Sequence, residues 1–346
     1  MNIVEESVFF DIEKLRNRKV FLFDISVWNR LADGKDNESI EVCETLIALK
    51  DKGVLFCPLS APAILELRKQ AGISFMRTAK LMEELSLNVT FRGIDQLFNY
   101  EIDHFIKYLL TDEFIPLSID KLFGPLLSYL SPYFLLINSA GQLTEEQKKF
   151  NDSLSEHIQN ISLTSLMEKL GEKSSPGSKQ THKFQAANIK RNEFCKGEKT
   201  KMKRLEQEHI AKSIILPRFN EMVSILPLEQ QFFIINKLDK LPKSKKYGSI
   251  LEHMLSFMPA LSSYVQITTV SGYDTNRKDT DNDFFDKEIL IYGLSYASVF
   301  VAFDRWVKDL IGLIRKDRNI ASLCYVGNLH DLKEQLKISN IHLSFK

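Results

Sequence analysis

The sequence predicts an α/β protein in which a parallel sheet flanked by helices is interrupted by a long all-α insertion. Short apolar runs alternate with helical periodicity over residues 1–94. Helical periodicity alone continues over residues 95–264, and the alternation returns over residues 265–346. Because alternating strands and helices build covered parallel sheets, residues 1–94 and 265–346 are expected to form one split domain around the insertion.

The N-terminal elements follow from apolar runs and helix signals. Strands are expected at Val20–Phe23, Val54–Cys57 and Asn88–Phe91. Ser60 is typical of an N-cap, and Pro62 falls in the first turn that would follow it. A helix is therefore expected to leave the second strand at Ser60.

The same reasoning assigns the remaining elements. Helices are expected in the insertion at Glu101–Leu110, Ile119–Leu130, Glu145–Leu170, Gln185–Leu216 and Leu228–Leu238. The C-terminal part is expected to contain helices at Phe284–Ala297, Arg305–Ile314 and Leu332–Leu336, and strands at Val299–Phe303 and Ala321–Val326.

The composition is typical of a globular protein. The chain has 346 residues, of which 44% are hydrophobic and 26% charged, and it contains no apolar run of about 20 residues that would span a membrane. Its four cysteines form no C-x-x-C pair, so we expect neither a zinc site nor a disulfide framework, and a cytoplasmic location. No phosphate-binding G-x-x-x-x-G-K-[ST] loop occurs.

Charge is segregated along the chain. The net charge is +1, yet residues 173–212 contain 11 Lys or Arg against 4 Glu, a net of +7. Such a segment is often a solvated helix face, but it can also grip the phosphates of a nucleic acid. We favour the second interpretation, and the candidate phosphate-binding residues are Lys190, Arg191, Lys199, Lys201, Lys203 and Arg204.

Four carboxylates lie where a site can form. Asp24 directly follows the first strand, and Asp304 directly follows the strand Val299–Phe303. Ligands of open parallel sheets bind beyond the carboxyl ends of the strands, near a topological switch point. Glu66 lies in the helix after the second strand, and Asp286 opens the helix that precedes the strand ending at Asp304. We expect these four acids to converge at one edge of the sheet.

Clustered carboxylates repel one another, and a hard divalent cation such as Mg²⁺ or Mn²⁺ resolves that repulsion. A cation held in this way activates water and neutralises a leaving oxygen, so the pattern favours metal-assisted hydrolysis of a phosphodiester. A structural interpretation stays open. Asp24 and Asp304 are also typical N-caps, Asp283 and Asp286 fit a cap with its third-position acid, and Glu66 fits a solvent-facing helix residue.

Three segments, taken in order, resemble the PIN-domain nucleases. Phe21–Gly34 (FLFDISVWNRLADG) is similar to the opening of that family, a strand ending in D-x-N or D-x-S, with Asp24 and Ser26 at the two polar positions. Leu55–Lys69 is similar to the second block and places Glu66 on its acid, 42 residues after Asp24 (66 − 24).

The third block lies near the other end of the chain. Asn282–Ile311 resembles it, with Asp286 and Asp304 on the third and fourth acids, 18 residues apart (304 − 286). The resemblance departs from the family at Ala302, where Thr or Ser is frequent, and in the length of the insertion. The chain is thus most similar to larger bacterial PIN-like proteins with an inserted helical region.

The resemblance implies a set of roles. Asp24, Glu66, Asp286 and Asp304 would hold one or two Mg²⁺ or Mn²⁺ ions and carry out catalysis. Ser26 would support Asp24 or a metal-bound water, and Asp283 is a substitute for Asp286 as a metal ligand. The products would carry a 5′-phosphate and a 3′-hydroxyl.

The leading hypothesis is therefore a hydrolase, a metal-dependent endoribonuclease that serves as a toxin or in phage defence. An RNA substrate and an antitoxin or regulatory partner come from the family alone, and no membrane partner is expected. A catalytically inactive PIN-like module that binds nucleic acid or protein, and a structure-specific DNA nuclease, stay open as alternatives. A homo-oligomer also stays open.

Overall fold

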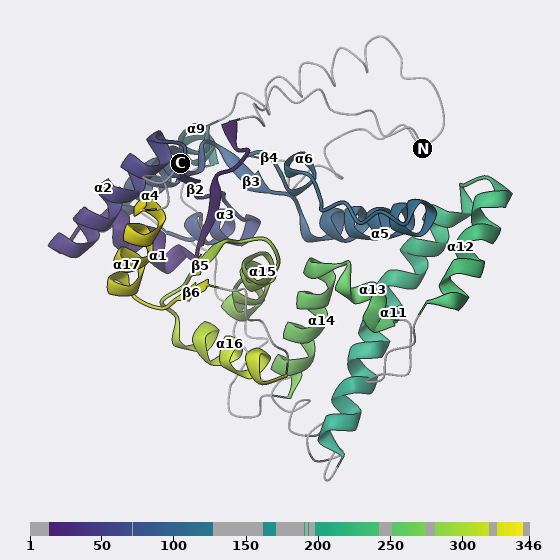
Figure 1. Ribbon diagram of the computed structural model, residues 1–346. Coiled ribbons are helices and arrows are strands. Elements are labelled where there is room, and N and C mark those ends of the chain that lie inside the picture. The colour runs from purple at the N-terminus through teal and green to yellow at the C-terminus, as the bar shows by residue number, and fades with distance from the viewer. Residues whose placement is uncertain are drawn as a thin grey trace.

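The computed structural model describes residues 14–70, 72–126, 162–170, 190, 193, 198–241, 251–273, 281–317 and 324–341. These residues form a mixed α/β protein that is mostly helical and contains a four-stranded parallel sheet (Figure 1). The α/β class expected from the sequence is confirmed. Within the part of the chain described here, no helix combines the length and the apolar character needed to cross a membrane.

Both ends of the chain contribute to the parallel sheet. Its strands are β1 (Lys19–Phe23), β2 (Leu55–Phe56), β5 (Val299–Val301) and β6 (Cys324–Val326), in the order β2-β1-β5-β6. The chain leaves β1 for β2 on one side and returns to the other side of β1 as β5. The topological switch point therefore lies between β1 and β5, where ligands of such sheets bind.

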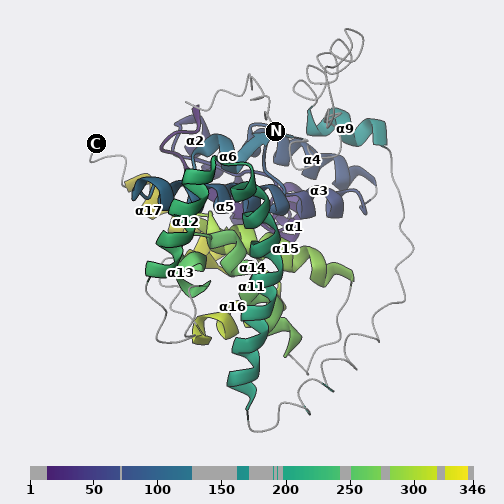
Figure 2. The same cartoon turned by 90° about the vertical axis from the view of Figure 1, so that its right-hand side faces the viewer.

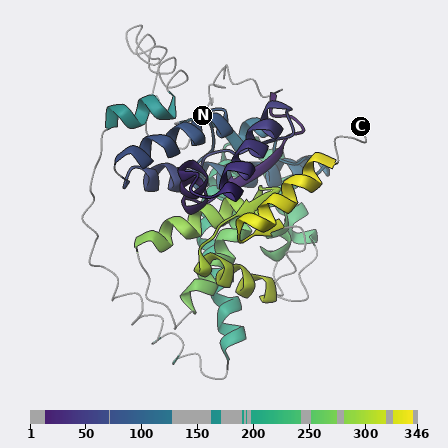
Figure 3. The same cartoon turned by 90° about the vertical axis from the view of Figure 1, so that its left-hand side faces the viewer.

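Alternate residues of the central strands face two separate hydrophobic layers, as the two-residue period of a strand requires. Phe21 and Phe23 of β1 belong to one core cluster, and Leu22 belongs to the other. The first layer is covered by α1 (Ile25–Asp33), α2 (Asn37–Asp51), α4 (Gly72–Ser86) and α17 (Leu329–Ile341) (Figure 3).

The second layer extends far from the sheet, because the helices of the insertion pack into it. It contains residues of α5 (Ile94–Thr111), α11 (Lys199–Ser224), α12 (Leu228–Lys240), α13 (Leu251–Ser256), α14 (Pro259–Gly272), α15 (Asp281–Ser295) and α16 (Arg305–Asp317). Figure 1 shows α11, α12 and α13 on the side away from α17. The strands and the insertion therefore share one continuous apolar core.

The N-terminal elements agree closely with the prediction. Ser60 is the N-cap of α3 (Ala61–Leu67), and its Oγ accepts the Ala63 N–H at 3.4 Å. Pro62 lies in the first turn of this helix, where its missing N–H costs nothing. The predicted strand at Val54–Cys57 is shorter in the structure, where β2 covers two residues.

One predicted helix is wrong. The sequence pattern predicts a helix over Ile119–Leu130, but the structure has only the short α6 (Ile119–Leu122), followed by β4 (Phe123–Pro125). Strand β4 pairs antiparallel with β3 (Val89–Phe91) in a second sheet. Gly124 and Pro125 disfavour a helix, and the Phe123 ring instead packs 4.7 Å from the ring of Phe91. The insertion is therefore not entirely helical.

The predicted helix Gln185–Leu216 ends later in the structure than the sequence predicts. Helix α11 continues through Pro217 to Ser224. Arg218 anchors this extension to α5, because its guanidinium donates to Asp95 at 2.8 Å and to Asn99 at 3.1 Å. Tertiary contacts thus override the helix-breaking tendency of proline.

The C-terminal elements are where the sequence predicts them, with ends shifted by a few residues. Strands β5 and β6 and helices α15, α16 and α17 follow in the expected order. Of the predicted helix at Glu145–Leu170, only α9 (Leu163–Leu170) lies within the described residues. Gly293 lets α15 approach β5 closely, since a Cβ at this position would lie 2.8 Å from the Phe300 ring.

Candidate active site

Asp24 lies directly beyond the end of β1 and caps the helix that follows. Its side chain is buried, with 4% of the residue exposed, and its Oδ2 accepts the Ser26 hydroxyl at 2.5 Å and the Ser26 N–H at 3.3 Å. The Asp24 N–H donates to the Val301 carbonyl of β5 at 3.0 Å, which extends the pairing of the two strands. Ser26 therefore fixes the orientation of the Asp24 carboxylate.

Asp304 lies at the same edge of the sheet, because β1 and β5 are neighbouring parallel strands. Its Oδ1 accepts the Trp306 N–H at 2.6 Å and the Val307 N–H at 3.3 Å, so it caps the start of α16. Burial raises the pKa of Asp24, and the negative charge of Asp304 adds to this rise, whereas the hydrogen bonds from Ser26 oppose it. The two aspartates therefore repel each other across the switch point.

Glu66 completes a cluster of three acids. It lies on α3, is half-buried, and has a pKa raised to about 7. Burial is the main cause, the charges of Asp24 and Asp304 add to it, and Lys69 opposes it. Three separate segments therefore place these carboxylates within electrostatic influence of one another near one edge of the sheet.

Tyr325 on β6 also belongs to this edge of the sheet and was not singled out from the sequence. Its hydroxyl donates to the Ala302 carbonyl at 2.9 Å. Burial, together with the charges of Asp304 and Asp24, raises the pKa of Tyr325 to about 12, so the phenol stays protonated near neutral pH. Tyr325 could be identified only from the pairing of β5 with β6, which places it opposite Phe300.

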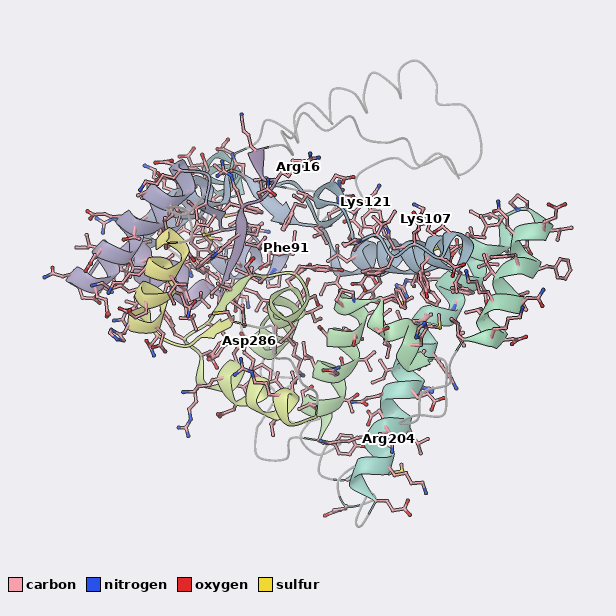
Figure 4. The ribbon with its side chains drawn as sticks, in the orientation of Figure 1. Arg16, Phe91, Lys107, Lys121, Arg204 and Asp286 are labelled. Atoms are coloured by element: carbon pink, nitrogen blue, oxygen red, sulfur yellow. The ribbon has the colours of Figure 1, made fainter. Side chains whose placement is uncertain are left out.

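Asp286 lies on α15, whose first turns pack near α3. The preceding residue, Phe285, has its ring 4.3 Å from the Lys69 ammonium, so the first turns of α15 lie against the end of α3 that also carries Glu66. Figure 4 labels Asp286 near β6 and α16. Asp283 belongs to the first turn of α15, but its side chain lies outside the described residues.

Four of the predicted basic residues lie at the start of α11, namely Lys199, Lys201, Lys203 and Arg204. This end of α11 projects from the rest of the described residues in two views (Figures 1 and 2). Lys201 pairs with Glu198 at 3.2 Å, and the Lys203 ammonium lies 5.5 Å from the centre of the Tyr273 ring. Figure 4 shows Arg204 on this projecting end of α11 and Asp286 in a different part of the molecule.

The other predicted basic residues are described only in part. Lys190 is exposed. Arg191 and the side chain of Lys199 lie outside the described residues, as does most of the predicted basic segment before residue 198. Phosphate binding by this segment therefore stays a prediction.

The donor set fits a hard divalent cation, which prefers carboxylate oxygens. The charge of Asp304 raises the pKa of Asp24, and the charges of Asp24 and Asp304 raise the pKa of Glu66. In the described part of the chain, however, no three His, Cys, Asp or Glu side chains lie close enough to hold one ion. Binding would therefore require these side chains to turn toward one another.

Comparison of the chain with protein-family models, with curated proteins and with solved structures gives no match. The arrangement of residues at the sheet edge therefore carries the functional argument.

Proposed function

We propose that this protein is a PIN-like, metal-dependent endonuclease that hydrolyses phosphodiester bonds of RNA. The observation that carries the proposal is that Asp24 and Asp304 follow neighbouring parallel strands at the topological switch point, with Glu66 within electrostatic influence of both. Carboxylates that lie near one another in a partly buried site are costly, and hydrogen bonds and Lys69 offset only part of that cost. A divalent cation would relieve the remainder. The preference for RNA, and a role in toxicity or phage defence with an antitoxin or regulatory partner, rest on the resemblance of three sequence segments to PIN-domain nucleases.

Each residue has a chemical role in this proposal. Asp24, Glu66 and Asp304 would hold Mg²⁺ or Mn²⁺, with Asp286 approaching from α15. When bound, the cation supplies positive charge for the phosphate oxygens and the leaving group. Ser26 keeps the Asp24 carboxylate oriented, and Tyr325 braces the end of β5 through the Ala302 carbonyl.

The protonation state of Glu66 would change when the site is filled. Without a cation its pKa is about 7, so its carboxyl group exchanges a proton with solvent near neutral pH. A nearby positive charge lowers the pKa of a carboxyl group, so Glu66 would release its proton as the metal binds.

A second candidate function is a catalytically inactive PIN-like module that binds nucleic acid or protein. The observation that favours it is that the two aspartates also have a structural role as helix caps. Asp24 and Asp304 both cap helices, and within the described residues no three potential ligands are gathered around one point. In that case Asp24 and Asp304 would serve only as helix caps, and the protein would act through binding alone.

The deciding experiment measures cleavage of labelled single-stranded RNA and of DNA, including flap-containing duplexes, with Mg²⁺, Mn²⁺ or EDTA. Wild type is compared with Asp24→Asn, Glu66→Gln and Asp286→Asn, and with Asp51→Asn as the matched control. Asn retains N-capping ability, so Asp24→Asn removes the charge while preserving the start of α1. Asp51 is exposed at the end of α2, before β2 and away from the carboxyl ends of the strands.

The expected result is RNA cleavage that needs the metal, falls at least ~100-fold in Asp24→Asn and Glu66→Gln, and is unchanged in Asp51→Asn. Cleavage of DNA alone would transfer the proposal to a DNA nuclease. Retained nucleic-acid binding with no cleavage of any substrate would favour the inactive module. Cleavage that persists in all three site variants would overturn the assignment of the site.

A further inference from the structure

Helix α12 carries an unusual amount of exposed apolar surface. We define the α12 stripe as Ile225, Leu228, Phe232 and Ile235, whose exposed fractions lie between 52 and 70%. Leu228, Phe232 and Ile235 follow one another at four- and three-residue intervals, so they share one face of the helix. Ile234 is buried and packs the opposite side of α12 into the core.

The stripe is presented on a rigid support. Gln231 at the start of α12 donates to the Leu226 carbonyl at 2.7 Å and to the Ser224 carbonyl at 3.3 Å, which fixes the turn between α11 and α12. Lys237 pairs with Asp112 at 2.6 Å and ties α12 to the end of α5. A surface held at both ends in this way loses little entropy when it is covered.

The size of the stripe matches one half of a small protein interface. With roughly 200 Å² for a large, fully exposed apolar residue, the stripe presents about 500 Å² of apolar surface. That is near the upper end for a monomer that leaves its surface uncovered. Two such stripes in contact would bury about 1,000 Å², the lower bound of a specific interface, before the flanking polar residues are added.

The pattern of the stripe is nearly symmetric about its centre. Phe232 has Leu228 one turn before it and Ile235 one turn after it. Two antiparallel copies of α12 that cross at Phe232 would place Leu228 of each copy against Ile235 of the other. An interface with two-fold symmetry requires a surface patch that is complementary to itself in this way.

The charges of α12 favour the same arrangement. Glu229 lies in the first turn of the helix, and the last turn carries Lys237 and Lys240 with the exposed Asp239 between them, a net charge of +1 (2 − 1). An antiparallel pair brings the acidic beginning of each helix toward the basic end of the other and also opposes the two helix dipoles. We propose that the α12 stripe is the interface through which two copies of this chain form a symmetric dimer, with Phe232 at the two-fold axis.

Two measurements on the full-length protein test this proposal. The first is the molar mass in solution, determined by sedimentation equilibrium over a range of concentrations for wild type, Phe232→Glu and Gln230→Glu. Both substitutions add one negative charge to an exposed position of α12, but residue 230 lies on the other side of the helix from the stripe. Circular dichroism and thermal unfolding establish that each variant is folded.

Wild type and Gln230→Glu are expected to behave as dimers of two 39.9-kDa chains at micromolar concentration. Phe232→Glu is expected to weaken dimerisation by ~100-fold or more, because the substitution places two charges against each other at the centre of the interface. A monomeric wild type, or equal dimerisation of folded Phe232→Glu, would overturn the proposal.

The second measurement reports on the symmetry axis. The Phe232→Cys and Gln230→Cys variants are treated with diamide, which takes two electrons and two protons from a pair of thiols as the disulfide forms. Rapid cross-linking of Phe232→Cys into covalent dimers, without such cross-linking of Gln230→Cys, is expected. A wild type that dimerises while neither variant, or only Gln230→Cys, cross-links would show that another surface forms the dimer.

Discussion

Replacing Glu66 by Gln is expected to stabilise the folded protein at alkaline pH, although it removes a residue of the proposed active site. The pKa of Glu66 rises from 4.5 to about 7 on folding, chiefly because of burial and secondly because of Asp24. A folded-state pKa above the unfolded value means that the folded protein binds the proton more tightly. Stability is therefore lost as the pH rises from about 4.5 to about 7, and the loss is complete above pH 7.

The size of this loss follows from the shift. Each unit of pKa shift corresponds to about 1.36 kcal/mol, so the full shift of the Glu66 pKa corresponds to roughly 3 kcal/mol of unfolding free energy. Because part of the Glu66 side chain reaches solvent, screening reduces the cost to about 1–2 kcal/mol. Gln cannot ionise, so Glu66→Gln is expected to be about 1–2 kcal/mol more stable than wild type at pH 8, and about 0.5 kcal/mol or less at pH 5.

The assay is urea unfolding of wild type, Glu66→Gln and Glu44→Gln at both pH values, in the presence of EDTA. Glu44 is exposed on α2 and serves as the matched control. The difference in unfolding free energy between Glu44→Gln and wild type is expected to be the same at both pH values. Burial also raises the pKa values of Glu101 and Glu288 to about 7, but their contribution is common to all three proteins and cancels in the differences.

Adding Mn²⁺ at pH 8 extends the test to the proposed metal site. A cation that binds the folded state stabilises it by mass action, and wild type should gain more than Glu66→Gln. If Glu66→Gln differs from wild type equally at pH 5 and pH 8, the reasoning about the acid cluster is wrong. If Mn²⁺ stabilises both proteins to the same extent, Glu66 is not a ligand.

Two further predictions concern the core. Gly293→Ala places a Cβ 2.8 Å from the Phe300 ring and should lower the free energy of unfolding by about 1–3 kcal/mol in urea, whereas Gly312→Ala, with open space around it, should be neutral or slightly stabilising. A neutral Gly293→Ala would show that α15 moves away from β5 at little cost. Glu101→Ala removes the buried carboxylate that accepts the Ala260 N–H at 2.6 Å and also binds the Tyr296 hydroxyl, so it should cost about 2–4 kcal/mol by the same assay; a loss below 1 kcal/mol would mean that water replaces the carboxylate.

Local signals in the sequence predict most of the parallel sheet. The apolar run before Asp24 and the run before Asp304 indicate strands β1 and β5, and Ser60 with Pro62 marks the start of α3. These signals are short-range, because capping and apolar runs depend on neighbouring residues alone. The prediction that both chain ends share a sheet adds only the rule that alternating strands and helices form covered parallel sheets.

The misses share a different physical cause. Helix α11 passes through Pro217 because Arg218 is held by α5, a contact across more than 100 positions of sequence. Phe123 leaves the expected helix to pack on Phe91, and Tyr325 joins the candidate site only through the register of β6 on β5. Long-range packing of this kind leaves no periodic trace in the sequence, so pattern analysis could not find it.

Glu66 separates the functional interpretation of the site from the structural one more sharply than the aspartates do. Asp24 and Asp304 each cap a helix, and that task alone explains an aspartate at the end of a strand. Glu66 caps nothing, and within the described part of the chain no hydrogen bond accounts for its carboxylate. A half-buried glutamate beside two other acids lowers stability at neutral pH, and the positive charge of Lys69 offsets that loss only in part. A bound cation, or a proton exchanged with the substrate, would explain why a destabilising glutamate occupies this position. The Glu66 variants therefore provide the most decisive tests of the proposed nuclease.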